Sequence, residues 1–256
     1  MIEHNFRRSQ ELASRSPRRV HTLASLVPLL FTCFVCLAAA KGLAHNRVNA
    51  HAPASALSAD AFTDTLAANP LTSDALAATA QTALEDPEAR DLLASVVRCA
   101  LPAGSQIGLT VDGIDYTFEG EFGLAPQWGQ PHGSCGSSCQ AWVSACVIAR
   151  IDFLGAPADI SMRGPHRGLV STAEERAIYS NREATYWGNI FATPLIARAC
   201  LSPGQTQIPR VCGPSIDDCV VDVVGSCDAV CEGVRGDGSF VRCGGTNAGI
   251  TAFRRP

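Results

Sequence analysis

The sequence predicts an α+β fold with a buried central helix, a small antiparallel sheet and a disulfide-rich, loop-rich C-terminal region. Three observations indicate this. Residues 139–154 are apolar on nearly every side of a helix, residues 107–118 hold two β-rich segments around a turn, and six of the twelve cysteines lie between Cys200 and Cys243. Hydrophobic residues make up 46% of the chain, which is enough to bury a core and unlike a disordered protein.

Residues 1–40 have the pattern of a signal peptide. Five arginines precede an apolar stretch at 23–40 that ends in three alanines, where a signal peptidase can cut. A retained N-terminal anchor is the alternative, although 18 residues are at the lower limit for a spanning helix and Pro28 interrupts them. In both cases the positive-inside tendency predicts export of the remaining chain to the periplasm, the cell surface or the extracellular space.

The remaining chain divides into two segments. Residues 41–70 are rich in alanine and show little periodicity, so we expect a disordered linker, followed by one globular domain at 71–256. Of 20 basic and 24 acidic residues, five and two lie in 1–40, which leaves 15 basic and 22 acidic residues beyond it. Such an acidic body without a basic cluster indicates that nucleic acid is not a partner, because phosphate binding needs clustered cations.

Two helices are expected at the start of the domain. Good helix formers fill residues 72–84. Asp86 and Pro87 then supply an N-cap and a proline at the first position of a second helix. Apolar residues repeat at helical spacing from there to the turn that contains Cys99, and Pro102 ends the pattern.

The strands are expected to begin with a β-hairpin. Residues 107–111 and 114–118 are rich in β-formers, and Asp112-Gly113 between them is a turn pair that tolerates positive φ. A further short strand is expected at 159–162.

The central helix is expected at 139–154. Ser137 or Ser138 is the predicted N-cap, since Ser137-x-x-Gln140 fits a capping box, and Gly155 is the predicted stop. A helix that is apolar all round is normally buried, so we expect the core to be built on this element.

Ten cysteines lie beyond the signal segment, and export to an oxidising compartment predicts that they form disulfides. They are Cys99, Cys135, Cys139, Cys146, Cys200, Cys212, Cys219, Cys227, Cys231 and Cys243. On one helix Cys139 and Cys146 would lie about 10 Å apart along the axis, so they cannot bond to each other. If the first four pair among themselves, either Cys99–Cys146 accompanies Cys135–Cys139, or Cys99–Cys139 accompanies Cys135–Cys146. The last six would then form three bridges of their own.

Zinc binding is the rival use of these cysteines. Cys227-x3-Cys231 and His132-x2-Cys135-x3-Cys139 contain ligand types for zinc, but neither has a second half with the usual spacing. We therefore expect no metal site and no other cofactor.

The segment from Gly133 to Trp142 resembles the box of papain-like proteases, in which a nucleophilic cysteine opens a buried helix. A thiol at a helix N-terminus has a lowered pKa, so Cys139 with His166 would form a secreted hydrolase. However, an extra residue separates the two cysteines, Trp142 is displaced, and His166 follows only 27 residues later. A helix with a structural disulfide at its start is the favoured interpretation, and no catalytic residue is predicted.

Aromatic and basic residues offer candidate binding surfaces. Trp142 is expected in the core. Trp128, Tyr186 and Trp187 stand in or near glycine-rich segments, where aromatic side chains can bind carbohydrate or peptide, although core packing is the simpler interpretation. The last candidate is a short basic turn that could bind an anion, and it contains Arg163, His166 and Arg167.

Several segments together resemble a group of uncharacterised exported Cys-rich proteins of myxobacterial type. These segments cover about half of the chain beyond the signal segment, and they are residues 97–102, 122–128, 142–146, 160–164 and 186–191. The resemblance implies export and a shared Cys-rich domain, and it implies no activity and no functional residue.

These observations predict an exported structural or binding protein that is not an enzyme. Its ligand is unknown and would be found at the cell surface or outside the cell. Contact with a membrane would occur only through an uncleaved N-terminal segment.

Overall fold

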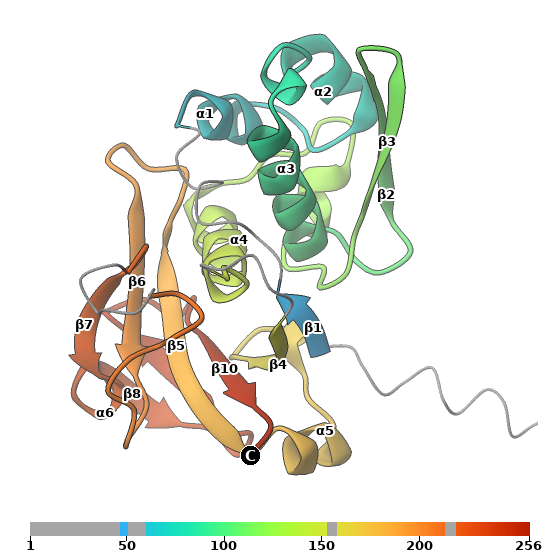
Figure 1. The fold of residues 1–256 in the computed structure, drawn as a ribbon. Coiled ribbons are helices and arrows are strands. Elements are labelled where there is room, and N and C mark those ends of the chain that lie inside the picture. The colour runs from blue at the N-terminus through green and yellow to red at the C-terminus, as the bar shows by residue number, and fades with distance from the viewer. Residues whose placement is uncertain (1–46, 51–59, 153–157, 213–218) are drawn as a thin grey trace, which may run out of the picture. The chain divides into compact units, whose positions relative to one another are not determined.

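The four helices between residues 60 and 149 gather on one side of a mixed sheet in the computed structural model, which describes residues 47–50, 60–152, 158–212 and 219–256 (Figure 1). The helices are α1 Asp60–Ala68, α2 Ser73–Thr79, α3 Pro87–Ala100, α4 Ser137–Ala149, α5 Ala173–Ile178 and α6 Cys227–Val230. The strands are β1 Arg47–Ala50, β2 Gln106–Val111, β3 Ile114–Glu119, β4 Ala158–Arg163, β5 Asn181–Asn189, β6 Ile196–Leu201, β7 Asp222–Ser226, β8 Cys231–Val234, β9 Phe240–Cys243 and β10 Ile250–Arg254. The predicted α+β class is confirmed. The predicted signal peptide, 1–40, lies outside the described residues.

Helix α3 begins where the sequence predicts. The Asp86 carboxylate accepts a hydrogen bond from the backbone N–H of Glu88 at 3.0 Å, and Pro87 occupies the first helical position. Both features are typical of helix N-termini, because they satisfy or remove an N–H group that lacks a partner in the helix. One face of α3 is buried, including Cys99 in its last turn.

Strands β2 and β3 form the predicted hairpin. Asp112 and Gly113 both have positive φ, at 51° and 77°, and Val111 pairs directly with Ile114. Two central residues with positive φ match the right-handed twist of the flanking strands, which is why this pair of residues joins them so tightly.

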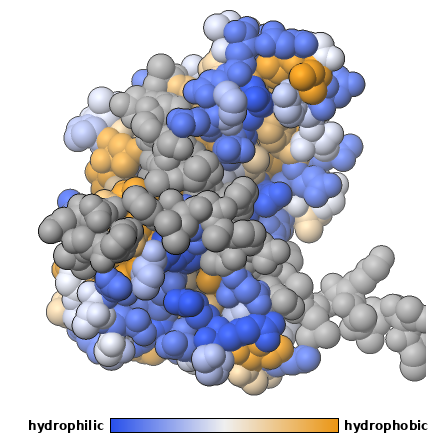
Figure 2. All heavy atoms as spheres, in the orientation of Figure 1, coloured by the Kyte–Doolittle hydropathy of each residue, from blue (hydrophilic) through white to orange (hydrophobic). Residues whose placement is uncertain are grey.

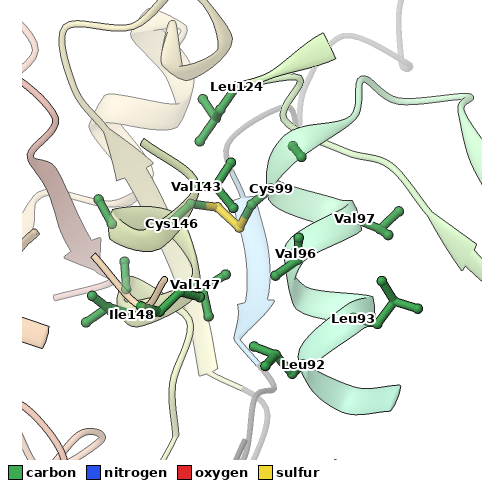
Figure 3. Close-up of a cluster of buried hydrophobic side chains, with 14 of the residues drawn as sticks. Leu92, Leu93, Val96, Val97, Cys99, Leu124, Val143, Cys146, Val147 and Ile148 are labelled. Atoms are coloured by element: carbon green, nitrogen blue, oxygen red, sulfur yellow. A yellow bond between two sulfur atoms is a disulfide. The ribbon is translucent and has the colours of Figure 1, made fainter. Parts of the chain in front are cut away.

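Helix α4 is the predicted buried central helix, and it lies between α3 and the sheet (Figure 1). From Val143 to Ala149 every side chain of α4 is buried. Figure 3 shows the Cys99–Cys146 disulfide among aliphatic side chains of α3 and α4, such as Val96 and Val147. The core of the protein is therefore built on this helix, as the sequence predicts.

The ends of α4 differ from the predicted ones. Gly136 is the N-cap in place of a serine, and Gln140 donates to the carbonyl of Cys135 at 3.0 Å instead of closing a capping box. The helix ends at Ala149, whereas the sequence predicted continuation to residue 154. The next residue, Arg150, is the C-cap; it is buried, and its guanidinium lies 3.5 Å from the carboxylate of Glu121. The predicted stop at residue 155 lies outside the described residues.

Six of the described strands form one sheet in the order β1-β4-β10-β5-β6-β7. Neighbouring strands are antiparallel except for β6 and β7, which are parallel. The strand expected at 159–162 is β4. The sheet is larger than the small antiparallel one that the sequence predicted, because β1, β4, β5 and β10 pair across long separations in the chain. Small antiparallel pairs are present too, in β2-β3 and β8-β9.

The boundary of the folded region is also corrected. The expected disordered linker, 41–70, contains β1, which pairs with β4, and α1, and residues 40–256 belong to one structural unit. Phe62 and Leu66 on α1 are four residues apart and buried. These two apolar positions are enough to dock α1, but they are too few to stand out as periodicity among so many alanines.

Five disulfides crosslink the described chain, and they use all ten predicted cysteines. They are Cys99–Cys146, Cys135–Cys139, Cys200–Cys227, Cys212–Cys219 and Cys231–Cys243. The first of the two schemes left open by the sequence is therefore the observed one, and the last six cysteines pair among themselves. The cysteines thus form bridges instead of the zinc sites that were the rival use.

The described surface is mixed in character. On the face drawn in Figure 2, hydrophilic and hydrophobic residues are interspersed. Within the described ranges, none of the helices has the length and the apolar character needed to cross a bilayer.

Candidate functional site

A cavity of about 510 Å³ lies between the start of α4 and the loop that follows β9. Its lining combines small polar side chains, one indole ring and one guanidinium. The lining residues are Ser137, Ser138, Ala141, Trp142, Arg242, Gly245, Thr246, Asn247 and Ala248. Arg242 is the only charged residue among them, so the cavity has a positive character.

The helix wall of the cavity is the first turn of α4. No side chain caps this end of the helix, and Ser137 and Ser138 are exposed. The N–H groups of a first turn have no partner within the helix, and the helix dipole places partial positive charge there. This wall therefore adds hydrogen-bond donors and positive potential to the guanidinium opposite.

The loop wall of the cavity is tightly folded. Cys243 and Thr246 exchange two backbone hydrogen bonds, at 2.9 and 3.0 Å, and the Arg242 guanidinium donates to the carbonyl of Gly245 at 3.2 Å. Gly244 has φ of 56°, and a Cβ at this position would collide with the indole nitrogen of Trp187. Only glycine fits here, so the backbone path of this wall depends on that residue.

Trp142 lies at the edge of the cavity, half-buried, against His166. The two ring centroids are 5.0 Å apart. His166 accepts a hydrogen bond through Nδ1 from the N–H of Gly168 at 3.1 Å, so the neutral ring carries its proton on Nε2. Burial, reinforced by the charge of Arg167, lowers the pKa of His166 and favours this neutral form.

The two residues of the hydrolase hypothesis, Cys139 and His166, have other partners. The sulfur of Cys139 is bonded to that of Cys135, so the thiolate that a nucleophile requires is absent while this bridge is intact. The imidazole of His166 accepts a hydrogen bond from the N–H of Gly168 and lies against the ring of Trp142. The arrangement fits the favoured interpretation, a structural disulfide at the start of a helix.

Three of the four aromatic candidates are buried, whereas Trp142 is only partly buried. Trp128, Tyr186 and Trp187 are buried, so core packing is correct for them and surface binding is wrong. The Trp128 indole donates to the carbonyl of Asn69 at 2.8 Å, which satisfies its polar atom inside the core. Trp142, which was expected in the core, is instead only partly buried and lines the cavity.

Within the basic turn, Arg163 is not available to an anion. Arg163 is buried, and its guanidinium donates to the hydroxyl of Ser161, the carbonyl of Asp237 and the carbonyl of Tyr179. Its ring partner is Phe253, whose centroid lies 3.8 Å from the guanidinium carbon. The side chain of Arg163 therefore points inward from β4. It connects this strand to β10, to the residue after α5 and to the loop before β9.

A buried ionic cluster was missed by the sequence. Arg210 donates to Glu183 at 2.7 Å and to the hydroxyl of Tyr186 at 3.0 Å, and Tyr186 in turn donates to Glu183 at 3.2 Å. Burial raises the pKa of Tyr186. Burial acts to lower the pKa of Arg210, but Tyr186 and Glu183 outweigh it and the pKa is raised. No local signal marks this cluster, because Arg210 lies 24 and 27 positions from its two partners on β5.

No family model matches the chain, and no curated protein or solved structure matches it. The function is therefore inferred from the cavity and the bridges themselves.

Proposed function

We propose that the protein is an exported, non-catalytic binding protein, and that the cavity between α4 and the loop after β9 binds an acidic saccharide. The observation that carries this proposal is the convergence of Arg242, the uncapped N-terminus of α4 and the face of Trp142 on one cavity. The myxobacterial-type resemblance supports export but adds nothing about the ligand.

Export is supported by the disulfides and by the N-terminal sequence. Five bridges in one chain indicate an oxidising environment. Residues 1–40 have the arginine-rich start and apolar stretch of a signal peptide. Both features support the proposal that the folded part of the chain works outside the cytoplasm, in the periplasm, at the surface or beyond it.

The ligand class follows from the groups that line the cavity. A carboxylate of the ligand would be held by Arg242 and by the free N–H groups of the helix start, because charge-assisted hydrogen bonds are the strong ones. Hydroxyl and amide side chains, such as Thr246 and Asn247, suit the hydroxyl groups of a sugar. The partly exposed indole of Trp142 offers an apolar face for the sugar ring.

The test is a titration of the exported protein with galacturonic acid oligomers, followed by tryptophan fluorescence and calorimetry. We expect saturable binding that neutral galactose oligomers do not reproduce. Arg242→Gln removes a charge-assisted bond and should weaken binding about tenfold or more. Trp142→Leu should weaken it too and should reduce the fluorescence response.

Arg198→Gln is the matched control for the arginine, since Arg198 is about half exposed on β6 and lies outside the cavity lining. It should bind like the unmodified protein. Equal affinity for galactose oligomers, or an Arg242→Gln variant with unchanged affinity, would refute the proposed ligand class.

A thiol titration separates this function from the hydrolase. The folded exported protein should show no reactive thiol at Cys139, because its sulfur belongs to a bridge. A reactive thiol there, together with shortening of the oligomers detected by mass spectrometry, would favour the enzyme instead.

A further inference from the structure

Two disulfides touch at β6, because Cys200 on this strand belongs to one of them and contacts a sulfur of the other. Sγ of Cys200, which is bonded to Cys227, lies 3.6 Å from Sγ of Cys231, which is bonded to Cys243. Sγ atoms of Cys200, Cys231 and Cys243 all lie within 4.8 Å of one another. Two sulfurs at van der Waals distance need only a small approach to form a bond. The two bridges are therefore close enough to exchange a sulfur partner.

The four cysteine residues differ in exposure to solvent. Cys200, Cys227 and Cys243 are at most 1% exposed, whereas Cys231 is partly exposed. A thiol from outside therefore reaches the Cys231–Cys243 bridge at Cys231. Thiol–disulfide exchange depends on such access and on which sulfur is attacked.

We propose that Cys200, Cys227, Cys231 and Cys243 form one thiol–disulfide exchange centre, which an external dithiol enters at Cys231. The dithiol attacks Cys231 and releases Cys243 as a thiolate. Its second thiol then closes the dithiol into a cyclic disulfide and releases Cys231 as a thiolate. That thiolate attacks Sγ of Cys200, the Cys200–Cys231 bond forms, and Cys227 leaves as a thiolate.

The net result of these reaction steps is a single two-electron reduction of the protein. The dithiol loses two electrons and two protons, and the protein gains two thiols, on Cys227 and Cys243, while one disulfide, Cys200–Cys231, remains. The internal attack transfers the bond without further electrons. It changes the link from β6–α6 to β6–β8.

Burial gives the internal step its direction. Without the internal attack on Cys200, the reduced centre keeps a free thiol on the partly exposed Cys231. After the internal attack, the two free thiols are those of Cys227 and Cys243, which are buried. A buried cysteine is accommodated as a small apolar group and reacts slowly, so the exchanged form is both stabilised and protected.

The test treats the native protein with one equivalent of dithiothreitol, quenches with acid, unfolds the chain and alkylates it with N-ethylmaleimide. Among molecules that have lost one disulfide of this centre, peptide mapping should find a Cys200–Cys231 bridge in most, with label on Cys227 and Cys243. Label on Cys231 and Cys243 beside an intact Cys200–Cys227 bridge would overturn the proposal. So would a Cys231–Cys243 bridge that stays closed after the Cys200–Cys227 bridge has been reduced.

A variant tests the internal step without any reductant. Cys243→Ser leaves Cys231 without its partner, and the free thiol should then appear on Cys227 instead of Cys231. The matched control is Cys219→Ser, which leaves Cys212 free away from the sulfur contact, and its thiol should remain on Cys212. A thiol that stays on Cys231 in the first variant contradicts the proposal, as does equal reshuffling in the control.

Discussion

Buried charges in this protein are stabilised by their immediate partners. Glu183 and Arg210 are both nearly inaccessible to solvent, and Tyr186 bridges them with its hydroxyl. Removing two charges from water costs several kcal/mol for each ion, so each ion of such a pair depends on the charge and the hydrogen bonds of the other. Loss of one partner should therefore be far more harmful than loss of both.

Substitution at this pair tests that reasoning. Arg210→Met leaves the buried Glu183 with only the more distant and half-exposed Arg254, at 3.9 Å, as a cationic neighbour. It should lower the free energy of unfolding by about 3–5 kcal/mol, measured by urea denaturation. The double variant Glu183→Gln with Arg210→Met should cost less than the sum of the two single changes. Asp222→Asn is the control, because its pair with Arg198 is exposed, and it should cost less than about 1 kcal/mol. Additive single effects at the buried pair would contradict the interpretation.

At the residue scale, the sequence predicted those features that depend on neighbouring residues, namely a helix cap and a turn. Asp86 and Asp112-Gly113 were identified because a cap or a turn depends on adjacent residues. The pair of Glu183 and Arg210 could not be identified, because 27 positions separate them and a charged residue usually indicates the surface. Trp142 was misplaced for a similar reason, since a tryptophan in an apolar helix gives no sign that its face is open.

The elements are joined by bridges of very different span. Cys99–Cys146 connects α3 to α4 across 47 positions, whereas Cys135–Cys139 spans only four at the start of α4. A crosslink stabilises mainly by restricting the unfolded chain, and the restriction grows with the size of the closed loop. The two bridges should therefore contribute unequally.

Paired alanine variants measure the difference. Removing Cys99 and Cys146 together should lower the free energy of unfolding by about 4 kcal/mol, and removing Cys135 and Cys139 together by about 2 kcal/mol, on the loop-closure estimate. Urea denaturation of the two double variants under non-reducing conditions gives both values. Equal losses, or a larger loss for the short bridge, would show that packing or strain outweighs chain entropy here.

Elements with a repeating pattern were predicted well, and elements without one were not. The periodicity of α3 and the apolar character of α4 come from many residues and identify both helices. Helix α1 was assigned to a linker, because alanines hide the two buried side chains that dock it. Two disulfide schemes stayed open at this scale, since helix geometry excludes one pairing but not the rest.

Stability of the whole molecule should depend on pH through His166. Its pKa in the folded protein is lowered from 6.5 by burial and by Arg167, so the unfolded chain binds more protons between the two values. The free energy of unfolding should therefore fall as the pH is lowered through about 6.5, and it should be highest above that pH. Denaturation of the unmodified protein and of His166→Gln at several pH values checks this. The variant should lack this part of the pH dependence, while a variant of the exposed His132 should keep it.

The arrangement of the sheet was beyond the sequence. Its order places β10 between β4 and β5, and β1 beside β4, which are pairings between distant segments. Nothing local specifies which strand lies next to which, because antiparallel neighbours need only matching faces and lengths. The class of fold follows from composition and pattern, whereas its topology follows from packing around α4.

The position of β10 also governs the order in which the sheet can assemble. Strands β4 and β5 are synthesised one after the other, yet each hydrogen-bonds to β10 and not to the other. Until that strand emerges from the ribosome, the half of the sheet with β1 and β4 remains separate from the half with β5 and β6. The sheet of a nascent chain is therefore completed only after β10, the strand that joins its two halves, has been synthesised.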